Sequence, residues 1–341
     1  MQLLLDLYKI SSPSRKEKEM IRFITRKLEE MSVPYEVDRH GNIYAIKGNA
    51  ETYPCVVAHT DEVHPKRAKG YEVVNFRDTI ILGFNMQKKQ FVGIGADDKN
   101  GIWICLKCLE EYEYMKCAFF MGEEEGCIGS NRANMAFFDD CRYVLQCDRK
   151  GNDDFITSIS GMELCSKDFL KDINLPAHGY KINHGLQTDV AILKQRGLEV
   201  SCVNISCGYY NPHTNEEYTK IADLNKCHQL VKHIIETCTD RYEHHYETYR
   251  RWFGRYGIHY PYGFGTSFDF EEDEMIIPQS RRHFKNQSFK QRDYNSLLNV
   301  MSNRLAFDSS LTVDDLMDIY KDRFPEAVRQ DYETAYREIM G

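Results

Sequence analysis

Hydrophobic residues recur with two different periods along the first 240 residues of the chain. Near the amino terminus the period is helical, and the segments MQLLLDLYKI and KEKEMIRFITRKLEEM flank a turn around Pro13. In the second segment Met20, Ile21, Ile24 and Leu28 fall on one face of a helix. The first thirty residues therefore predict a pair of helices, of which the second buries one face.

Short apolar runs rich in β-branched and aromatic residues predict the strands. In chain order they are CVVAH, TIILGF, FVGIGA, CAFFMG, YVLQCD, FITSI and CVNIS. Helical patterns follow some of them, namely NGIWICLKCLEEYEY, TDVAILKQRG and LNKCHQLVKHIIETC. Alternation of strands and helices predicts an α/β fold with a mixed, mostly parallel sheet and helices on both faces. In such sheets ligands bind beyond the carboxyl ends of the strands.

Beyond about residue 240 the pattern changes. Residues 241–292 are dense in Tyr, Arg and His and then in charged residues, without clean periodicity, which predicts a linker or a surface-wrapping segment. The mixture of aromatic and basic residues is also compatible with nucleic-acid binding, but Glu243, Glu247 and the acidic run at 269–274 disfavour it.

A mainly helical extension is expected over residues 293–341. Its predicted helices are Tyr294–Leu305, Val313–Tyr320 with Thr312 as the N-cap, and Glu326–Met340. We therefore expect a catalytic domain over residues 1–240, the linker, and this extension.

Composition narrows the class of protein. The chain has 341 residues, 42% of them hydrophobic and 28% charged, and its net charge is −8, which weakly disfavours a nucleic-acid partner. The apolar run Met1–Leu5 is too short for a signal peptide, and no run approaches the length of a membrane span. We therefore expect a soluble, cytoplasmic protein that binds neither nucleic acid nor membrane.

The twelve cysteines lie mostly inside apolar runs, as small buried hydrophobic residues do. Cys105 and Cys108 form a C-x-x-C pair, which could serve redox chemistry or bind zinc. The pair lies inside a predicted helix and no second C-x-x-C exists, so reduced, buried thiols are the simpler interpretation.

Residues able to bind metal follow five of the predicted strands. They are His59 and Asp61, Asp97 and Asp98, Glu123 to Glu125, Asp148, and His213. Taken singly, a histidine after a strand is more often a surface or packed residue, and a glutamate triplet is more often a solvated helix start. Their succession, all at one edge of one predicted sheet, indicates a metal centre instead.

The residue types favour particular ions. Imidazole and carboxylate ligands suit zinc, cobalt or manganese, whereas a set of thiolates would indicate structural zinc. In a His-x-Asp sequence the carboxylate can orient the histidine, and two adjacent glutamates can divide into a ligand and a general base. Two ions about 3.5–4 Å apart need a bridging carboxylate, for which an Asp after a glycine-rich strand end is well suited.

These motifs resemble those of the co-catalytic zinc aminopeptidase clan, which includes peptidase T, glutamyl aminopeptidases and bacterial leucyl aminopeptidases. The resemblance covers about residues 1–240 and rests on VAHTDEV, GIGADDKNG, GEEEGCIGS and GLQTDVAILKQRGLEVSCVNISCGYYNPHTNEE, in that order. It implies a three-layer α/β/α fold of the zinc-peptidase/phosphorylase-like type and two divalent ions, of which zinc is expected and cobalt or manganese are alternatives.

By this resemblance His59 and Asp148 would hold one ion, Glu124 and His213 the other, and Asp97 would bridge them. An aspartate at the fourth ligand position favours aminopeptidases over carboxypeptidases and deacylases.

The resemblance also assigns the residues around the ligands. Asp61 would orient His59, and Glu123 would be the general base for the attacking water, although the glutamate triplet permits a shift by one position. A cis peptide bond is implied between Asp97 and Asp98.

Other side chains could take part. Tyr209 and Tyr210 could contact a developing oxyanion, but packing is the favoured interpretation. His64, His178 and His184 could be further polar groups in the cleft, but ordinary surface positions are the favoured interpretation. Thr188 and Asp189 lie in a segment that the clan places near the site, so a supporting role is expected for them.

The leading hypothesis is an aminopeptidase that cleaves short peptides at the amino end through a metal-bridging water activated by a glutamate. A deacylase or carboxypeptidase using the same site is the alternative, and a non-catalytic binding protein with this fold is a third. Only 36 positions separate Asp61 from Asp97, and 65 separate Asp148 from His213, so we expect no inserted lid domain. Homo-oligomerisation is compatible with the resemblance.

Overall fold

The computed structural model describes residues 1–245, 297, 301, 305, 311–321, 324 and 327–340. The chain divides into two compact units, Met1–His259 and Tyr260–Gly341, which are described separately. Of the expected linker over residues 241–292, only the first five residues are described, and there Glu243 forms an isolated bridge with Val200. The expected domain boundaries stay a prediction.

A mixed sheet is the centre of the first unit. Among the described residues it has nine strands, in the order β1-β2-β7-β3-β8-β12-β9-β10, with β11 also paired to β9. The strands are β1 (Tyr35–Val37), β2 (Ile43–Lys47), β3 (Tyr53–His59), β7 (Met115–Phe120), β8 (Cys141–Arg149), β9 (Asp154–Ile159), β10 (Met162–Glu163), β11 (Lys181–Gly185) and β12 (Cys202–Ser206). The central strands β7, β3, β8 and β12 run parallel to one another, and the flanking pairs β2–β7 and β12–β9 are antiparallel.

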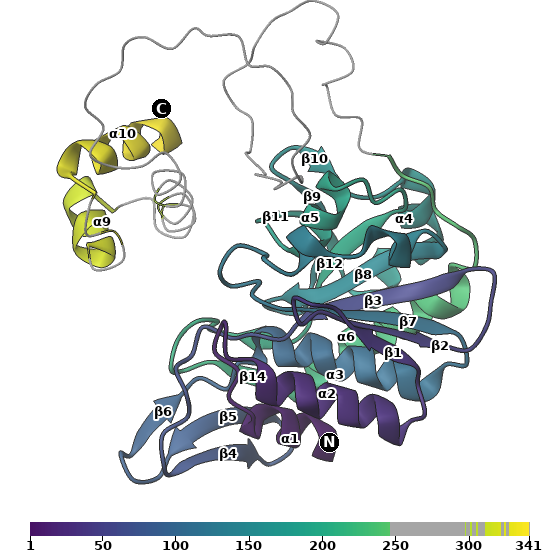
Figure 1. Ribbon diagram of the computed structural model, residues 1–341, viewed down its shortest axis with the longest axis horizontal. Helices are drawn as coiled ribbons and strands as arrows, with labels where there is room; N and C mark the ends of the chain where they lie inside the picture. The colour runs from purple at the N-terminus through teal and green to yellow at the C-terminus, as the bar shows by residue number, and fades with distance from the viewer. Residues whose placement is uncertain are drawn as a thin grey trace, which may run out of the picture. The chain divides into compact units, whose positions relative to one another are not determined.

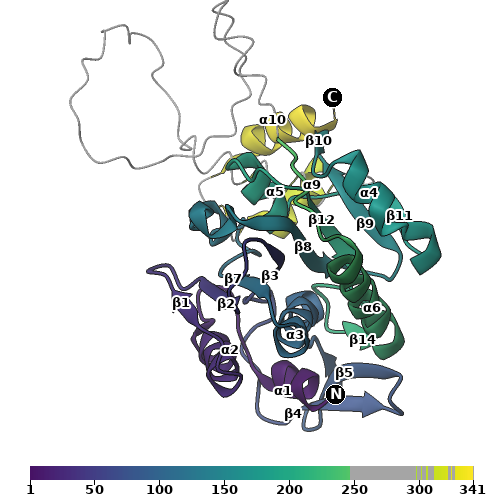
Figure 2. The same ribbon diagram turned by 90° about the vertical axis from the view of Figure 1, so that its right-hand side faces the viewer.

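Both faces of this sheet are buried. Along β3, Val56 and Ala58 belong to one hydrophobic core and Cys55 and Val57 to another, because successive side chains of a strand point to opposite faces. Residues of α1 (Gln2–Lys9), α2 (Lys18–Glu30), α3 (Ala96–Glu111), α4 (Lys167–Ile173) and α6 (Ile221–Thr237) pack into the first core. The second core is closed by α5 (Asp189–Gln195) and by the 3₁₀ turn Met135–Phe138. Figures 1 and 2 show α3 and α5 on opposite sides of the sheet, so the predicted three-layer α/β/α fold is confirmed.

A second, antiparallel sheet lies in the same unit. Its strands are β4 (Tyr71–Phe76), β5 (Ile80–Asn85), β6 (Gln90–Val92), β13 (Tyr209–Tyr210) and β14 (Tyr218–Lys220). TIILGF and FVGIGA were predicted as strands of the main sheet, and this prediction was wrong. TIILGF forms β5 of the second sheet, and within FVGIGA the strand ends at Val92. The run TIILGF is apolar throughout, yet Ile81 is fully buried whereas Ile80 and Leu82 are half-buried, so only one face of this strand is covered.

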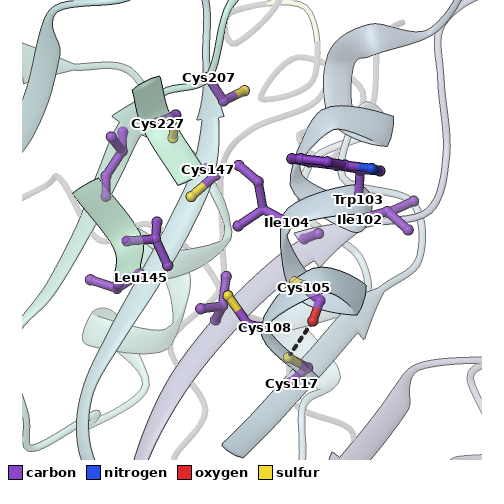
Figure 3. Packing of buried hydrophobic residues seen from close by; sticks show 14 of the residues in the cluster. Ile102, Trp103, Ile104, Cys105, Cys108, Cys117, Leu145, Cys147, Cys207 and Cys227 are labelled. Atoms are coloured by element: carbon purple, nitrogen blue, oxygen red, sulfur yellow. Dashed lines mark hydrogen bonds between the residues drawn. The ribbon is translucent and has the colours of Figure 1, made fainter. Parts of the chain in front are cut away.

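The cysteines behave as the sequence predicted. All twelve are free and buried. Cys105 and Cys108 lie in α3 within a thiol-rich part of the core, where the Cys117 thiol donates to the Cys105 carbonyl at 3.5 Å (Figure 3). Among the described residues no cysteine belongs to a cluster able to hold a metal ion.

The second unit has a core of its own. Helices α9 (Val313–Tyr320) and α10 (Arg329–Met340) contribute Leu316, Tyr332 and Ala335 to it. Thr312 caps α9 as predicted, since its side chain accepts a hydrogen bond from the Asp315 N–H at 3.3 Å in a capping box. Most of the predicted helix Tyr294–Leu305 falls outside the described residues. In the described parts of the chain, no helix is long and apolar enough to cross a membrane.

Candidate metal centre

Two sheets, rather than one, carry the candidate ligands. The main sheet supplies His59 at the end of β3, Asp148 near the end of β8, and Glu124 in the turn that follows β7. These are the carboxyl ends of three neighbouring parallel strands, as the sequence analysis expected. Asp97 and His213 depart from that expectation, because the segment after β6 and the loop between β13 and β14 of the second sheet carry them.

Asp97 lies between the two histidines. Its Oδ1 is 3.1 Å from His59 Nε2, and its Oδ2 is 3.3 Å from His213 Nε2. Beyond them, Asp148 Oδ1 is 3.8 Å from His59 Nε2, and Glu124 Oε1 is 3.2 Å from His213 Nε2. One carboxylate therefore faces two imidazoles, each of which has a second carboxylate beside it.

The backbone at Asp97 is unusual. Asp97 and Asp98 lie within the bounds of α3 but have non-helical ψ angles of 100° and 37°. The peptide bond between them is cis, as the resemblance implied. Asp98 itself accepts hydrogen bonds from the His59 N–H at 3.1 Å and the Gly101 N–H at 3.0 Å. It therefore ties the end of β3 to the start of α3.

Asp61 braces both His59 and the glutamate turn. Its Oδ1 lies 3.3 Å from His59 Nδ1 and accepts a hydrogen bond from the Glu123 N–H at 2.9 Å. Its Oδ2 accepts from the Ser14 hydroxyl at 2.7 Å and from the Glu124 N–H at 3.3 Å. Asp61 thus sets the ring of His59, whose Nδ1 also lies 3.1 Å from the Asp61 carbonyl oxygen, and its buried carboxylate holds the backbone that carries the two glutamates.

The three glutamates of the turn point to different partners. Glu124 faces His213, whereas Glu125 forms an ion pair with Arg15. Glu123 Oε1 has the thiol of Cys127 at 3.5 Å as a weak donor. Glu124, and not Glu125, therefore lies beside His213. A shift of the motif by one position would have made Glu125 the candidate ligand.

Both carboxylate oxygens of Asp148 accept hydrogen bonds from neighbouring side chains. Its Oδ2 lies 3.1 Å from both the Gln146 side-chain nitrogen and the Thr188 hydroxyl, and its Oδ1 accepts from the Tyr209 hydroxyl at 3.3 Å. Tyr209 is thus buried against a candidate ligand. Tyr210 instead donates to Asp223 at 2.6 Å.

Asp189, the neighbour of Thr188, is also close to the centre. It accepts a hydrogen bond from the Ser130 hydroxyl at 2.5 Å and is fully buried. Burial raises its pKa to about 6, against the lowering effects of His59 and Ser130.

The electrostatics of the centre favour a bound cation. Burial opposes the charged form of His59, yet the carboxylates of Asp148, Asp61 and Asp97 outweigh it and raise the pKa of His59 well above its usual value. Burial likewise opposes charge on His213, but Asp97 and Glu124 raise its pKa to about 11. The carboxylates that raise the pKa of both histidines also offer a strong field to a metal ion.

The residues fit divalent metal ions on a second ground. Glu124 Oε1 is buried and has no well-formed hydrogen bond among the described residues, and its near neighbour is His213 Nε2 at 3.2 Å, itself a candidate ligand. A buried carboxylate oxygen beside a neutral imidazole is costly unless a cation lies between them. Donor atoms of His59, Asp97 and Glu124 lie within 4.8 Å of one another, as do those of His59, Asp98 and Asp148. Nitrogen and oxygen donors of this kind suit zinc, cobalt or manganese.

A buried pair that no sequence pattern predicted, His64 and Glu217, lies next to the backbone of Asp97. His64 was expected at the surface, but it is only 6% exposed, and its Nε2 lies 2.9 Å from Glu217 Oε2. Glu217 is also buried, although in the sequence it looks like a solvated charge in the segment NEEY. No local pattern announces either residue, because their burial follows from contacts between distant segments.

Comparison with known proteins concerns the fold. No model of a protein family matches the chain, and no curated protein matches it. Among solved structures, the aminopeptidase PepT from Bacillus cereus is similar with a TM-score of 0.57 at 14% identity, covering 70% of this chain and 97% of that one. A tripeptidase from Staphylococcus aureus gives a TM-score of 0.56 at 15% identity over 70% and 97% of the two chains.

A third similar structure is the TET1 peptidase of Pyrococcus horikoshii, with a TM-score of 0.54 at 14% identity over 69% of this chain and 98% of that one. That peptidase can assemble into a tetrahedron or a large octahedral shell. The chain shares the fold of these peptidases. Identities this low establish the fold alone, and the evidence for an activity lies in the residues of the candidate metal centre.

Proposed function

We propose that the chain is a two-metal aminopeptidase that removes residues from the amino end of short peptides. The observation that carries the proposal is the position of Asp97, whose two carboxylate oxygens lie 3.1 and 3.3 Å from the two histidines. A carboxylate between two pairs of ligands is what a pair of adjacent ions requires. The fold shared with PepT, the tripeptidase and the TET1 peptidase supports the choice of a peptide substrate.

In this proposal His59 and Asp148 hold one ion, Glu124 and His213 hold the other, and Asp97 contributes to both. When bound, the ions would polarise the scissile carbonyl and acidify a water molecule. Zinc is the expected metal, with cobalt or manganese as alternatives of the same ligand preference.

Glu123 is the proposed general base. Burial raises the pKa of its carboxyl well above the usual value, and the neighbouring carboxylates of Asp148, Asp189 and Glu124 raise it further. A carboxyl group of raised pKa can accept a proton from the attacking water and pass it to the leaving amine. The hydrogen bond from the Glu123 N–H to the Asp61 carboxylate fixes the backbone position from which the Glu123 side chain extends.

Two structural features bear on the substrate and the assembly. The interval between Asp61 and Asp97 is occupied by β4, β5 and β6 of the second sheet, so the proposed lidless form has a small sheet where a larger insertion would stand. The shared fold with the aminopeptidase PepT and with a tripeptidase supports short peptides as substrates. The assembly of the TET1 peptidase into shells supports a homo-oligomer.

Metal content and peptide hydrolysis measured on one sample of the full chain test the proposal. We expect about two zinc, cobalt or manganese ions per chain and cleavage of peptides with a free amino end but not of the same peptides with an acetylated amino end. Preference for the blocked peptides, or for peptides cleaved from the carboxyl end, would reassign the site to a deacylase or a carboxypeptidase. A chain that takes up no metal would leave a binding protein with this fold.

A further inference from the structure

The proposed ligands are not anchored equally well. His59 and Asp148 lie on β3 and β8, adjacent strands of the main sheet that pair through Val57 and Gln146. His213 lies in the loop between two short strands, with its side chain 52% exposed and its φ at +64°. This region of φ is uncommon for residues other than glycine, so the loop must be held in place by other contacts.

Glu217 supplies such a contact. It follows His213 by four positions, and its side chain is fully buried behind Asp97. Its Oε2 accepts a hydrogen bond from the Gly95 N–H at 2.6 Å, and its Oε1 accepts from the Asp97 N–H at 3.2 Å. The loop that carries His213 is therefore hydrogen-bonded to the backbone at Asp97, about 120 positions earlier in the chain.

The surroundings of Glu217 are built for this contact. His64 Nε2 lies 2.9 Å from Glu217 Oε2. Gly93 leaves room for the imidazole of His64, since a Cβ at this position would stand 2.0 Å from the ring carbon Cε1. Gly95 has a φ of +65°, and a Cβ there would stand 2.0 Å from the carboxylate of Glu62. The two glycines thus let buried polar side chains pack directly against the segment that leads to Asp97.

We propose that Glu217, held by His64, is a positioning residue that locks the His213 loop to the Asp97 segment and so forms the ion site of Glu124 and His213. The inference rests on the proposed function. The site of His59 and Asp148 shares Asp97 but depends less on this contact, because Asp61, Gln146 and Thr188 hold its two other ligands in place. Loss of Glu217 should therefore weaken one metal-binding step much more than the other.

The test is a calorimetric titration of the metal-free full chain with Co²⁺, together with the visible absorption of the bound cobalt. The wild type is compared with Glu217→Gln and with the control Glu216→Gln, which changes an exposed glutamate of the same loop. Partners that support metal ligands contribute about 10–100-fold to affinity, so Glu217→Gln should weaken one of two binding steps by about that factor and change the cobalt spectrum of that step only. Glu216→Gln should match the wild type at both steps.

His64→Gln provides a second variant, since it disturbs the partner of Glu217 and retains the carboxylate. It should weaken the same step by a smaller factor, and it carries the test if Glu217→Gln does not fold. Equal weakening of both steps would indicate general damage and overturn the inference, as would two steps unchanged from the wild type. A wild-type chain that binds no cobalt would overturn the proposed function itself, whereas two ions in the wild type with no selective loss in the variants would overturn the inference alone.

Discussion

His59 and Asp148 each use one polar atom to contact a supporting residue and direct another toward the centre of the site. The Nδ1 side of His59 meets Asp61, which leaves Nε2 facing Asp97. The Oδ2 of Asp148 accepts from Gln146 and Thr188, whereas its Oδ1 lies 3.8 Å from His59 Nε2 and also accepts from the Tyr209 hydroxyl. Contacts of this kind orient ligands before an ion arrives and raise the affinity of the site.

At the residue scale, Glu123→Gln should lower kcat for peptide hydrolysis by about 10²–10⁴-fold, because the amide cannot accept the proton of the attacking water. The matched control is Glu125→Gln, which should stay near the wild-type rate because Glu125 pairs with Arg15 at the rim of the turn. Steady-state kinetics with metal content measured on the same samples checks both. Full activity of Glu123→Gln with the metals still bound would show that another group is the base.

At the scale of elements, a buried ionic cluster joins three segments beneath the start of α3. Glu62, in the loop after β3, accepts hydrogen bonds from Lys99 of α3 at 3.0 Å and from Arg67 at 2.7 Å. It also accepts from the Ser12 N–H, between α1 and α2, at 2.8 Å. Lys99 is buried as well and donates to the Ile94 carbonyl at 3.0 Å. The cluster therefore anchors the segment that precedes Asp97.

Glu62→Gln should lower the free energy of unfolding by about 3–5 kcal/mol, because it leaves the buried Lys99 and Arg67 without their counter-charge. Asp6→Asn is the control, since Asp6 pairs with Lys9 at the surface with 59% of the Lys9 side chain exposed. An exposed pair of this kind contributes at most about 1 kcal/mol. Urea unfolding of the metal-free proteins measures both changes, and equal effects of the two substitutions would contradict the prediction.

At the scale of the whole molecule, all the candidate site residues lie between His59 and His213, within the first of the two units. Both hydrophobic cores that cover the main sheet consist of residues of that unit, and the core of the second unit consists of its own residues. Neither core of the first unit uses a described side chain of the second.

A chain cut after His259 should therefore fold and bind the same number of metal ions as the full chain. Metal titration and circular dichroism of the shortened protein provide the measurement. Loss of both metal-binding steps in a folded, shortened chain would mean that the second unit contributes to the site.

Metal removal should also change the stability of the whole first unit, because ions that bind only the folded chain stabilise it. At a free concentration 100 times the dissociation constant, one ion adds about 2.7 kcal/mol. Thermal unfolding with excess Zn²⁺ should thus have a clearly higher midpoint than unfolding after dialysis against a chelator. Coincident midpoints would contradict a metal site in the folded protein.

Local patterns in the sequence predicted β3, β7, β8, β9 and β12 of the main sheet, and they indicated the candidate site residues, whose roles stay a prediction. The strand CVVAH, the helix of Met20, Ile24 and Leu28, and the Thr312 cap depend on neighbouring residues, and the structure shows each of them. The residues chosen for the metal centre also come together, because they follow strands or turns whose ends meet at one place.

How two sheets share that centre depends on contacts between distant segments of the chain. Whether an apolar run such as TIILGF joins the main sheet or a second one depends on which distant strand it pairs with, here β14 and β4. The burial of His64 and Glu217 is decided in the same way, since their mutual contact spans 153 positions and the bond from Glu217 to Gly95 spans 122. The residues that offer the chemistry can be selected from the sequence alone, because residue type and local period are written in it. The hydrogen bonds from the Gly95 and Asp97 N–H groups to Glu217 depend instead on the packing of distant segments, which no local period records.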